Sequence, residues 1–414
     1  MRFEEKLKRY ADLAVRAGCN LQKGQDLYLT APICAAEFAR MTVKSAYEAG
    51  ARQVIVQWTD EAVTRMGYEY SPLEVYEQYP EWMAKLRNGA AEQGAAMLFI
   101  DASNPGAMAG IDPRKPAASS RASNAACKPY RDAVNQGKVA WCIIAAAAPD
   151  WAAKVFPELP ADAALEQLWD CIFQAVRVDQ ADPNEAWETH RHNFDARRAL
   201  LNKYQFTSLH YKNAHGTDIT IGLPKNHNWA GGGAELADGR CFFPNMPTEE
   251  IFCSPHRDRA EGTVHSALPL NYHGNLIDDF SLTFHEGKVT DFSAAKGYDM
   301  LKELVGTDEN ACRLGEAALI PACSPIAQMG VLFYNTLYDE NASCHFALGR
   351  GFSECVQGGA SMSEEELVKA GVNASAAHVD FMLGTADLSI TGITADGREI
   401  PVFVDGGWAS EFQE

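Results

Sequence analysis

The sequence predicts two domains of different classes: a three-layer, Rossmann-like α/β domain, followed by a strand-rich α+β domain. Three observations lead to this prediction. The chain has 414 residues, which is too long for one ordinary hydrophobic core. Its first part alternates strand and helix patterns. From about Phe206 onward, the pattern changes to hairpins of alternating apolar and polar residues.

The first domain is predicted from hydrophobic periodicity and turn residues. An N-terminal helix is expected to end near Gly18, because apolar residues recur at helical spacing up to that point. A strand at 25–32, a helix at 35–50 and a strand at 52–58 form a β-α-β unit, which implies a parallel pair with a right-handed crossover. Further buried strands are expected at 95–102 and 138–148, and a further helix at 164–176. No G-x-G-x-x-G follows any of these strands, so a dinucleotide site is not expected.

A change of composition marks the start of the second domain. Proline and acidic residues at 179–187 precede a helix that runs to about Tyr204, so the domains are predicted at 1–185 and 186–414. Two hairpins are expected, each around a glycine turn, at 207–224 and 275–294. The helix 298–305 lies among the strands of this half.

Composition excludes several classes of partner. The formal net charge of −19 argues against nucleic acid and anionic membranes. No apolar run reaches the length of a membrane span, and the charged N-terminus does not resemble a secretory signal, so a cytoplasmic location is expected. The eleven cysteines contain no C-x-x-C pair, and free thiols in a reducing compartment are therefore expected.

Several polar side chains stand in apolar segments of the second domain. His378 and Asp380 lie two apart in an apparent strand, so they point to the same face. Glu316 lies in the apolar run 314–320, and a carboxylate is costly to bury unless it is paired or binds a metal. His345 lies between Cys344 and Phe346.

Two further acidic segments belong with these residues. Glu340 precedes His345 by five positions, and Glu249 and Glu250 open an apolar strand. Glu249 is expected to be a solvated neighbour of the glutamate that matters. Each of the polar residues also has a structural interpretation, as a carboxylate paired with arginine or a hydrogen-bonded core histidine. No local motif links them, so the residues alone leave this alternative open.

A metal site would explain the whole set. Two histidines and three carboxylates form a mixed nitrogen and oxygen donor set, which suits Zn²⁺, Co²⁺ or Mn²⁺. Five ligands exceed what one catalytic ion with an open position needs, and they suit two ions that share a carboxylate. Two ions of this kind fit the requirements of amide hydrolysis.

The strings PTEEIFCSPHRD, GEAALIP, DENASCHFALG and HVDFMLG, in this order, resemble the thermophilic metalloaminopeptidases of the aminopeptidase T, aminopeptidase S and PepS type. The resemblance covers the whole chain and implies a homodimeric exopeptidase that releases N-terminal amino acids from peptides with two divalent metals. It places the ligands at Glu250, Glu316, His345, His378 and Asp380, with Glu316 bridging the ions. Glu316 and Glu340 are the candidate catalytic residues, and Glu340 is either the general base or an additional ligand.

One position departs from the pattern of these enzymes. They usually carry a tyrosine near the metals, where this sequence has Phe352 in GRGFS. A phenol there could donate a hydrogen bond to the oxyanion, and its loss implies slower or differently tuned activity. Two other interpretations stay open: a ring-opening dioxygenase of the same fold with a single iron, and a non-catalytic relative that keeps the metals. Glu250 and Glu316 together favour two ions and hydrolysis.

Overall fold

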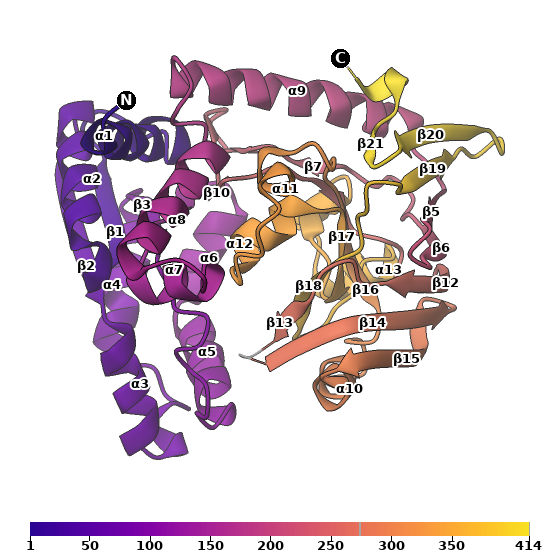
Figure 1. Ribbon diagram of the computed structural model, residues 1–414, viewed down its shortest axis with the longest axis horizontal. Coiled ribbons are helices and arrows are strands. Elements are labelled where there is room, and N and C mark those ends of the chain that lie inside the picture. The colour runs from indigo at the N-terminus through magenta and orange to yellow at the C-terminus, as the bar shows by residue number, and fades with distance from the viewer. Residues whose placement is uncertain (273–274, 414) are drawn as a thin grey trace. The chain divides into compact units, whose positions relative to one another are not determined.

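A computed structural model describes residues 1–413 except 273 and 274. The chain divides into two compact units (Figure 1). Unit 1 comprises residues 1–189 and 233–247, and unit 2 comprises residues 190–232 and 248–414. The predicted boundary between residues 185 and 186 stays a prediction, and the units themselves are not continuous in sequence.

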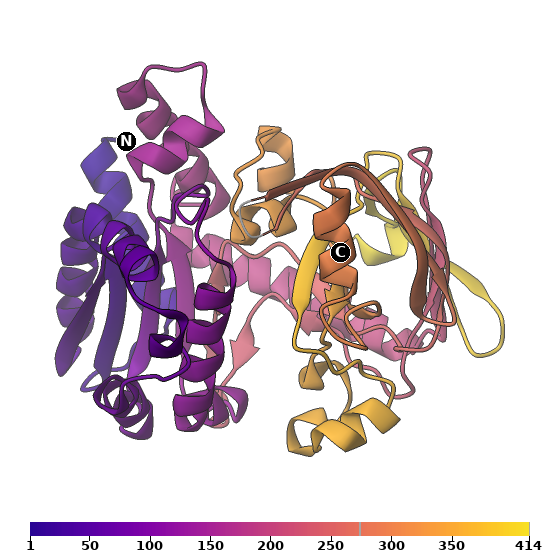
Figure 2. The same cartoon turned by 90° about the horizontal axis from the view of Figure 1, so that it is seen from below.

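Unit 1 is built on a parallel five-stranded sheet in the order β10-β4-β3-β1-β2. Helices cover both faces of this sheet (Figure 2). Its elements are α1 (Phe3–Leu13), η1 (Ala14–Gly18), β1 (Asp26–Pro32), η2 (Ile33–Ala35), α2 (Ala36–Ala49), β2 (Gln53–Thr59), α3 (Glu61–Tyr70), η3 (Leu73–Val75), α4 (Glu81–Glu92), β3 (Ala96–Asp101), α5 (Arg114–Ala126), α6 (Lys128–Asn135), β4 (Trp141–Ala145), α7 (Pro149–Val155), α8 (Ala161–Ala175), β8 (Ala234–Glu235), β9 (Cys241–Phe242) and β10 (Asn245–Met246).

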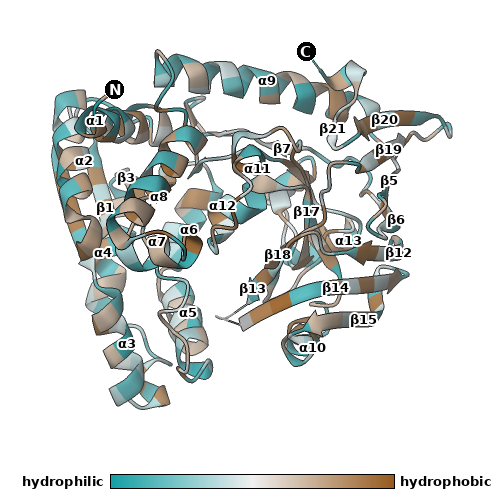
Figure 3. Cartoon of the chain, in the orientation of Figure 1, coloured by the Kyte–Doolittle hydropathy of each residue, from teal (hydrophilic) through white to brown (hydrophobic). Residues whose placement is uncertain are grey.

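The sequence predictions for this unit are confirmed at the level of elements. Strands β1 and β2 pair in parallel and flank α2, as the β-α-β pattern predicts. Gly50 ends α2 in the left-handed conformation with φ of 100°, which a glycine adopts without a Cβ clash. The N-terminal helix reaches Gly18, with its last turn in π-helical geometry. The helix α9 (Pro183–Tyr204) then leads the chain into unit 2, and most of its residues are hydrophilic (Figure 3).

Unit 2 contains two antiparallel sheets. One has five strands in the order β18-β17-β16-β11-β7, and the other has nine, in which β5 pairs with both β6 and β19, while β14 pairs with both β12 and β15. The elements are β5 (Ser208–Lys212), β6 (Asp218–Gly222), β7 (Ala230–Gly231), β11 (Ile251–Cys253), β12 (Ala260–His265), β13 (Leu270–Tyr272), β14 (Asn275–His285), β15 (Lys288–Lys296), α10 (Tyr298–Val305), β16 (Leu314–Leu319), α11 (Pro325–Met329), α12 (Thr336–Asp339), η4 (Glu340–Ala342), β17 (His345–Gly349), η5 (Ser353–Cys355), η6 (Gly359–Ser361), α13 (Glu364–Lys369), β18 (His378–Met382), β19 (Ser389–Ile393), β20 (Glu399–Val404), β21 (Gly407–Trp408) and η7 (Ser410–Phe412).

Both predicted hairpins are confirmed as antiparallel pairs, β5 with β6 and β14 with β15. The hydrophobic core of unit 2 joins its two sheets. Phe346 on β17 contacts Tyr211 on β5 at a ring-centroid distance of 4.9 Å, and Phe381 on β18 contacts Phe280 on β14 at 5.7 Å. One face of the five-stranded sheet is therefore committed to the core. Among the residues described, no helix is both long and apolar enough to span a membrane.

Candidate metal centre

The opposite face of the five-stranded sheet carries the candidate ligands. Strand β16 lies between β11 and β17, and β18 pairs with β17 on its other side. Across these strands Glu316 lies opposite Ala347, and Ala347 lies opposite Asp380. Because residues two apart in a strand share a face, His345 and His378 join this row on the same side of the sheet.

Small residues occupy the positions between the ligands. Ala318 lies opposite His345, and Gly349 lies opposite His378. Gly349 has φ of 105°, and a Cβ at this position would come within 2.2 Å of the carbonyl oxygen of Ala377. With Ala347, these residues leave space above the sheet into which the longer polar side chains converge.

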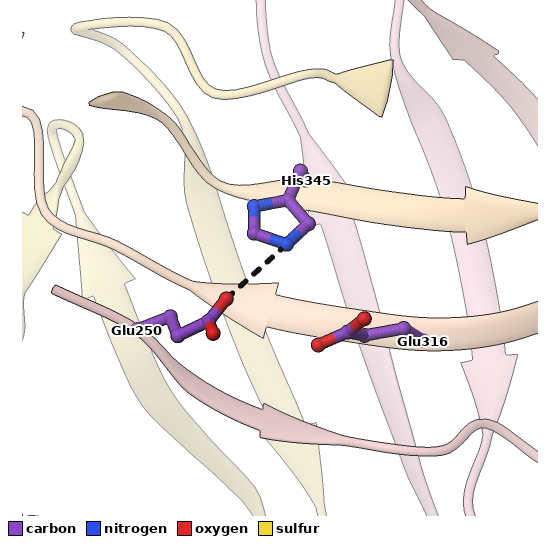
Figure 4. A group of neighbouring side chains, drawn as sticks. All are labelled: Glu250, Glu316 and His345. Carbon is purple, nitrogen blue, oxygen red and sulfur yellow. Dashed lines mark ion pairs between the residues drawn. The ribbon is translucent and has the colours of Figure 1, made fainter. Parts of the chain in front are cut away.

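The ligand atoms form two groups with one residue in common. Glu250, Glu316 and His345 form the first group, and Glu316, His378 and Asp380 form the second; within each group the ligand atoms lie within 4.8 Å of one another. Figure 4 shows the three side chains of the first group turned toward one another from β16, β17 and the residue before β11. Glu316 thus belongs to both groups.

The individual distances suit coordination. The Nε2 atom of His345 lies 3.4 Å from Oε2 of Glu250, and Nε2 of His378 lies 3.2 Å from Oε2 of Glu316. The distance from Nε2 of His378 to Oδ1 of Asp380 is 3.3 Å. Two ligands placed about 2.1 Å from a tetrahedral ion lie about 3.4 Å apart. The structure therefore brings together all five candidate ligands that the sequence predicts, in two groups that could each hold a divalent ion.

Both imidazoles are oriented by the backbone. Nδ1 of His345 donates to the carbonyl oxygens of Glu340 and Ser343, at 2.9 and 3.2 Å. Nδ1 of His378 donates to the carbonyl oxygen of Arg350 at 2.7 Å. Since Nδ1 is the donor in each ring, the Nε2 atoms turn toward the carboxylates, the arrangement in which a histidine ligates metal through Nε2.

The carboxyl groups of the site raise one another's pKa values. Burial, together with the charge of Glu316, raises the pKa of Glu250 to about 8. Burial and the charge of Asp380 raise the pKa of Glu316 to about 7, although the hydrogen bond with His378 lowers it. The pKa of Glu340 is raised well above its usual value by burial and by the charges of Glu250 and Asp380. Burial lowers the pKa of His378, but the bonds with Asp380 and Glu316 outweigh this effect and raise it to about 11.

These observations test whether the donors fit a metal. Four buried or half-buried carboxyl groups act on one another beside two imidazoles, and without a cation between them their mutual repulsion is costly. The ε nitrogens point at carboxylate oxygens at 3.2–3.4 Å, so a cation is needed between each such pair, either a proton or a metal ion. The mixed nitrogen and oxygen set matches borderline and hard divalent metals. The residues present fit a divalent metal centre.

Aromatic side chains lie beside this centre. The centroid of the Phe352 ring lies 4.9 Å from that of the His378 ring and 5.4 Å from that of the Phe252 ring. Phe252 pairs with Ala318 across strands β11 and β16. The position singled out by the sequence is therefore in contact with a candidate ligand. It offers a hydrocarbon surface there and no hydroxyl group.

One sequence expectation was wrong, and one residue was missed. Glu249 is not solvated, since its side chain is only 6% exposed. Its backbone N–H donates to the Asn341 side chain, which holds this segment inside unit 2. Its Oε2 atom lies 3.7 Å from Nε2 of His190. Asp339 was not singled out, since no periodicity marks it. Its buried carboxylate accepts the N–H groups of Phe333 and Asn335 and fixes the turn that leads to Glu340.

Fold and site together define a protein with a carboxylate- and histidine-rich candidate metal centre on a β-sheet. A family model described as "Thermophilic metalloprotease (M29)" matches residues 3–408, and the chain belongs to this metalloprotease family. It is 47% identical to "Aminopeptidase AmpS" of Bacillus subtilis (strain 168), with 98% of this chain and 99% of the relative covered. It is 45% identical to "Aminopeptidase 2" of Geobacillus stearothermophilus, with 99% of each covered.

Solved structures give the same result for the fold. "Wild-type AmpT from Thermus thermophilus" superposes with a TM-score of 0.92 at 38% identity, covering 99% of this chain and all of the other. The mixed α/β fold, with its parallel and antiparallel sheets, therefore matches a known structure of the family. A 2,5-dihydroxypyridine dioxygenase from Pseudomonas putida KT2440 superposes with a TM-score of 0.52 at 14% identity, covering 99% of this chain and 98% of the other. At that identity the likeness shows a shared fold alone.

Proposed function

We propose that this protein is a metal-dependent aminopeptidase with two divalent ions per chain, which releases N-terminal amino acids from peptides. The observation that carries the proposal is the presence of two ligand groups joined by Glu316. The family relationship supports the metal dependence, and the names of the relatives support the exopeptidase reaction. Bound ions of this kind would activate a water molecule and polarise the scissile carbonyl group.

The protein's own residues would divide the remaining work. Glu316 belongs to both groups, so it is proposed to bridge the two ions, with Glu250 and His345 on one side and His378 and Asp380 on the other. Glu340 belongs to neither group, yet its carboxyl group feels the charges of Glu250, Asp380 and Glu316. We therefore propose that the Glu340 carboxylate takes the proton of the attacking water and passes it to the departing amine.

The identity of the ions is proposed from the donors. Imidazole and carboxylate ligands suit Zn²⁺, Co²⁺ and Mn²⁺, and availability decides among them. Hydrolysis of leucyl and arginyl fluorogenic amides by chelator-treated protein, titrated with each metal, tests both the activity and the stoichiometry. We expect activity to return and to saturate near two equivalents per chain, and Glu316→Gln to remain folded and inactive.

The same assay separates the two rival interpretations. A dioxygenase of the shared fold would need O₂ and Fe²⁺, whereas hydrolysis continues under argon with Zn²⁺ or Co²⁺. Two bound ions without turnover, across a panel of N-terminal residues, would instead identify a non-catalytic relative. The presence of both Glu250 and Glu316 in one ligand group favours hydrolysis over single-iron chemistry.

A cytoplasmic homodimer is also proposed. The helices α3 and α4 of unit 1 expose large apolar side chains, including Met66 at 55%, Tyr70 at 85% and Trp82 at 70%. Aromatic and methionine side chains are the types enriched at protein interfaces, so they suit a contact between two copies of the chain. Light scattering on the wild type and on Tyr70→Glu tests this point: the wild type is expected at twice the chain mass, and the variant with a larger monomer fraction.

A further inference from the structure

A small cavity of unit 2 begins at the candidate metal centre. Its volume is about 50 Å³, and Asp380 of the second ligand group is one of its lining residues. Met382 also lines it, and because residues two apart in a strand share a face, Met382 is the next side chain after Asp380 on the ligand face of β18. A molecule held beside Asp380 therefore has this cavity next to it.

Much of the cavity wall is hydrocarbon. Pro269 and Leu270 line it where the chain enters β13, and Leu332 lines it from the segment before α12. The N–H of Ala267 donates to the carbonyl oxygen of Met382 at 2.7 Å, which holds the segment before β13 against the end of β18. All the described lining residues belong to unit 2, so the cavity is a feature of that unit alone.

The polar part of the wall does not favour a charged guest. None of the described lining residues is basic, so an acidic guest would meet carboxylates and no cation. Two carboxylates line the cavity, and both are already engaged. Asp380 is a candidate metal ligand, and Asp339 accepts the N–H groups of Phe333 and Asn335 at 2.7 and 3.0 Å. A basic guest would compete with those interactions, so the cavity suits an uncharged, apolar group.

The volume limits the size of that group. An apolar cavity of about 150 Å³ holds one benzene molecule, so a cavity of a third of that volume holds about two or three carbon atoms. The methyl group of alanine and the isopropyl group of valine are of this size. The benzyl group of phenylalanine is too large for it.

A larger cavity adjoins the first at Leu332. Its volume is about 350 Å³, and Leu332 lines both cavities. Leu268 lines the larger one, and the next residue, Pro269, lines the smaller one. The larger cavity is mainly apolar, with Ile320 and Ile326 in its wall, and none of the five candidate ligands lines it. It therefore offers hydrocarbon-lined space that a guest of the smaller cavity would reach past Leu332.

The residue that follows Leu332 fixes its position. Phe333 is fully buried, its ring centroid lies 4.9 Å from that of Tyr338, and its N–H donates to Asp339. Since the backbone at Phe333 is held in this way, the Leu332 side chain stays between the two cavities and limits the depth of the smaller one.

We propose that the cavity beside Asp380 receives the side chain of the N-terminal residue of the substrate, and that Leu332 restricts this side chain to short aliphatic groups. The inference rests on the proposed aminopeptidase function and names its substrate class, which is peptides that begin with alanine or valine. Leu332→Ala removes the part of the wall that the two cavities share, so the joined space admits an aromatic side chain.

Two measurements on the metal-loaded protein test this proposal. The first is kcat/KM for the alanyl, valyl, leucyl and phenylalanyl fluorogenic amides. The second is isothermal titration with free L-valine and L-phenylalanine, which requires no turnover. The wild type is expected to prefer the valyl over the phenylalanyl amide about tenfold or more, because one excess methylene in an apolar pocket already costs about tenfold. L-Valine is expected to bind more tightly than L-phenylalanine.

The variants test whether Leu332 sets the limit. Leu332→Ala is expected to raise kcat/KM for the phenylalanyl amide about tenfold and to tighten binding of L-phenylalanine, while alanyl hydrolysis changes less than about twofold. Leu332→Val is expected to shift the preference in the same direction by a smaller factor. Val331→Ala is the matched control: Val331 lines the larger cavity and not the smaller one, so this variant should keep the wild-type order.

The outcomes separate this proposal from the function on which it rests. A wild type that cleaves the phenylalanyl amide as well as the valyl amide would overturn the proposal and leave the aminopeptidase function intact. The same holds for folded Leu332 variants, checked by circular dichroism, that keep the wild-type order or lose all four activities equally. A wild type that binds metal and cleaves none of the four amides would refute the proposed function, and this inference with it.

Discussion

The shared position of Glu316 leads to a prediction about how many ions each variant binds. Five candidate ligands form two groups, and of these five Glu316 alone belongs to both. Replacing Glu250 with Gln removes a carboxylate from one group, and replacing Asp380 with Asn removes one from the other. Glu316→Gln removes a carboxylate from both at once.

The expected magnitudes follow from this count. Loss of groups that merely support a ligand lowers metal affinity about 10- to 100-fold, so loss of a ligand is taken as ~100-fold, or about 3 kcal/mol per site. Glu250→Gln and Asp380→Asn are thus expected to keep one tight ion and to lose about 3 kcal/mol of binding free energy. Glu316→Gln is expected to keep no tight ion and to lose about 6 kcal/mol.

Isothermal titration of chelator-treated protein with Zn²⁺ or Mn²⁺, followed by metal analysis after dialysis, measures both quantities. Glu303→Gln, an exposed acid on α10, is the matched control and should bind as the wild type does. The reasoning would be refuted by a Glu316→Gln protein that loses one ion and holds the other at wild-type affinity. Circular dichroism of each variant confirms that lost binding does not come from lost folding.

Four further outcomes are expected. Phe352→Tyr should raise kcat on a leucyl amide up to about a hundredfold through the added hydroxyl donor, without changing the number of bound ions. The variant Phe252→Tyr is its control. Equal rates in the wild type and both variants would exclude an oxyanion-stabilising role for a hydroxyl group at position 352. Glu340→Gln should lower kcat about 10²- to 10⁴-fold while two ions remain bound; loss of an ion in metal analysis would make Glu340 a ligand instead. Ala347→Leu should weaken metal binding in the same titration without removing a ligand, because the larger side chain fills the space between Glu316 and Asp380. Burial lowers the pKa of His227 from 6.5 to about 4, so the unfolded state binds the proton more tightly and stability falls as the pH drops through 6.5 towards 4. Urea unfolding should show a loss of about 2 kcal/mol between about pH 7.5 and 5 from this group, absent in His227→Gln.

Local signals account for the parts of the fold that the sequence predicts. The hairpins around Gly216 and Gly287 depend on period-two alternation and a turn residue, both of which a short window contains. The return of residues 233–247 to unit 1 has no such signal. There, β10 adds to β4 in parallel, and Phe243 donates its N–H to the carbonyl oxygen of Gly18, which are contacts between segments far apart in the chain.

Part of the candidate site is likewise visible in a short stretch of sequence, and part depends on how distant strands pair. The two-residue spacing of His378 and Asp380 places them on one face, whatever the rest of the fold. That Glu316 lies level with Asp380 depends on the register of three strands and on an irregularity between Leu314 and Glu316 that shifts the pairing. Neither is visible in the sequence, so without the family resemblance the five residues remained a plausible set and no more.

The two faces of the five-stranded sheet give the alanine and glycine residues between the candidate ligands a role in the proposed site. Phe346 and Phe381 alternate with ligand-bearing positions and lock β17 and β18 against the other sheet of unit 2. Because that packing sets the spacing of the strands, the ligands cannot move apart to accommodate a larger neighbour. Space for ions between the candidate ligands would then come from small residues on the same face, and Ala318, Ala347 and Gly349 occupy such positions. A relative with all five ligands and a bulky residue at one of these positions would keep the motifs and lose the site.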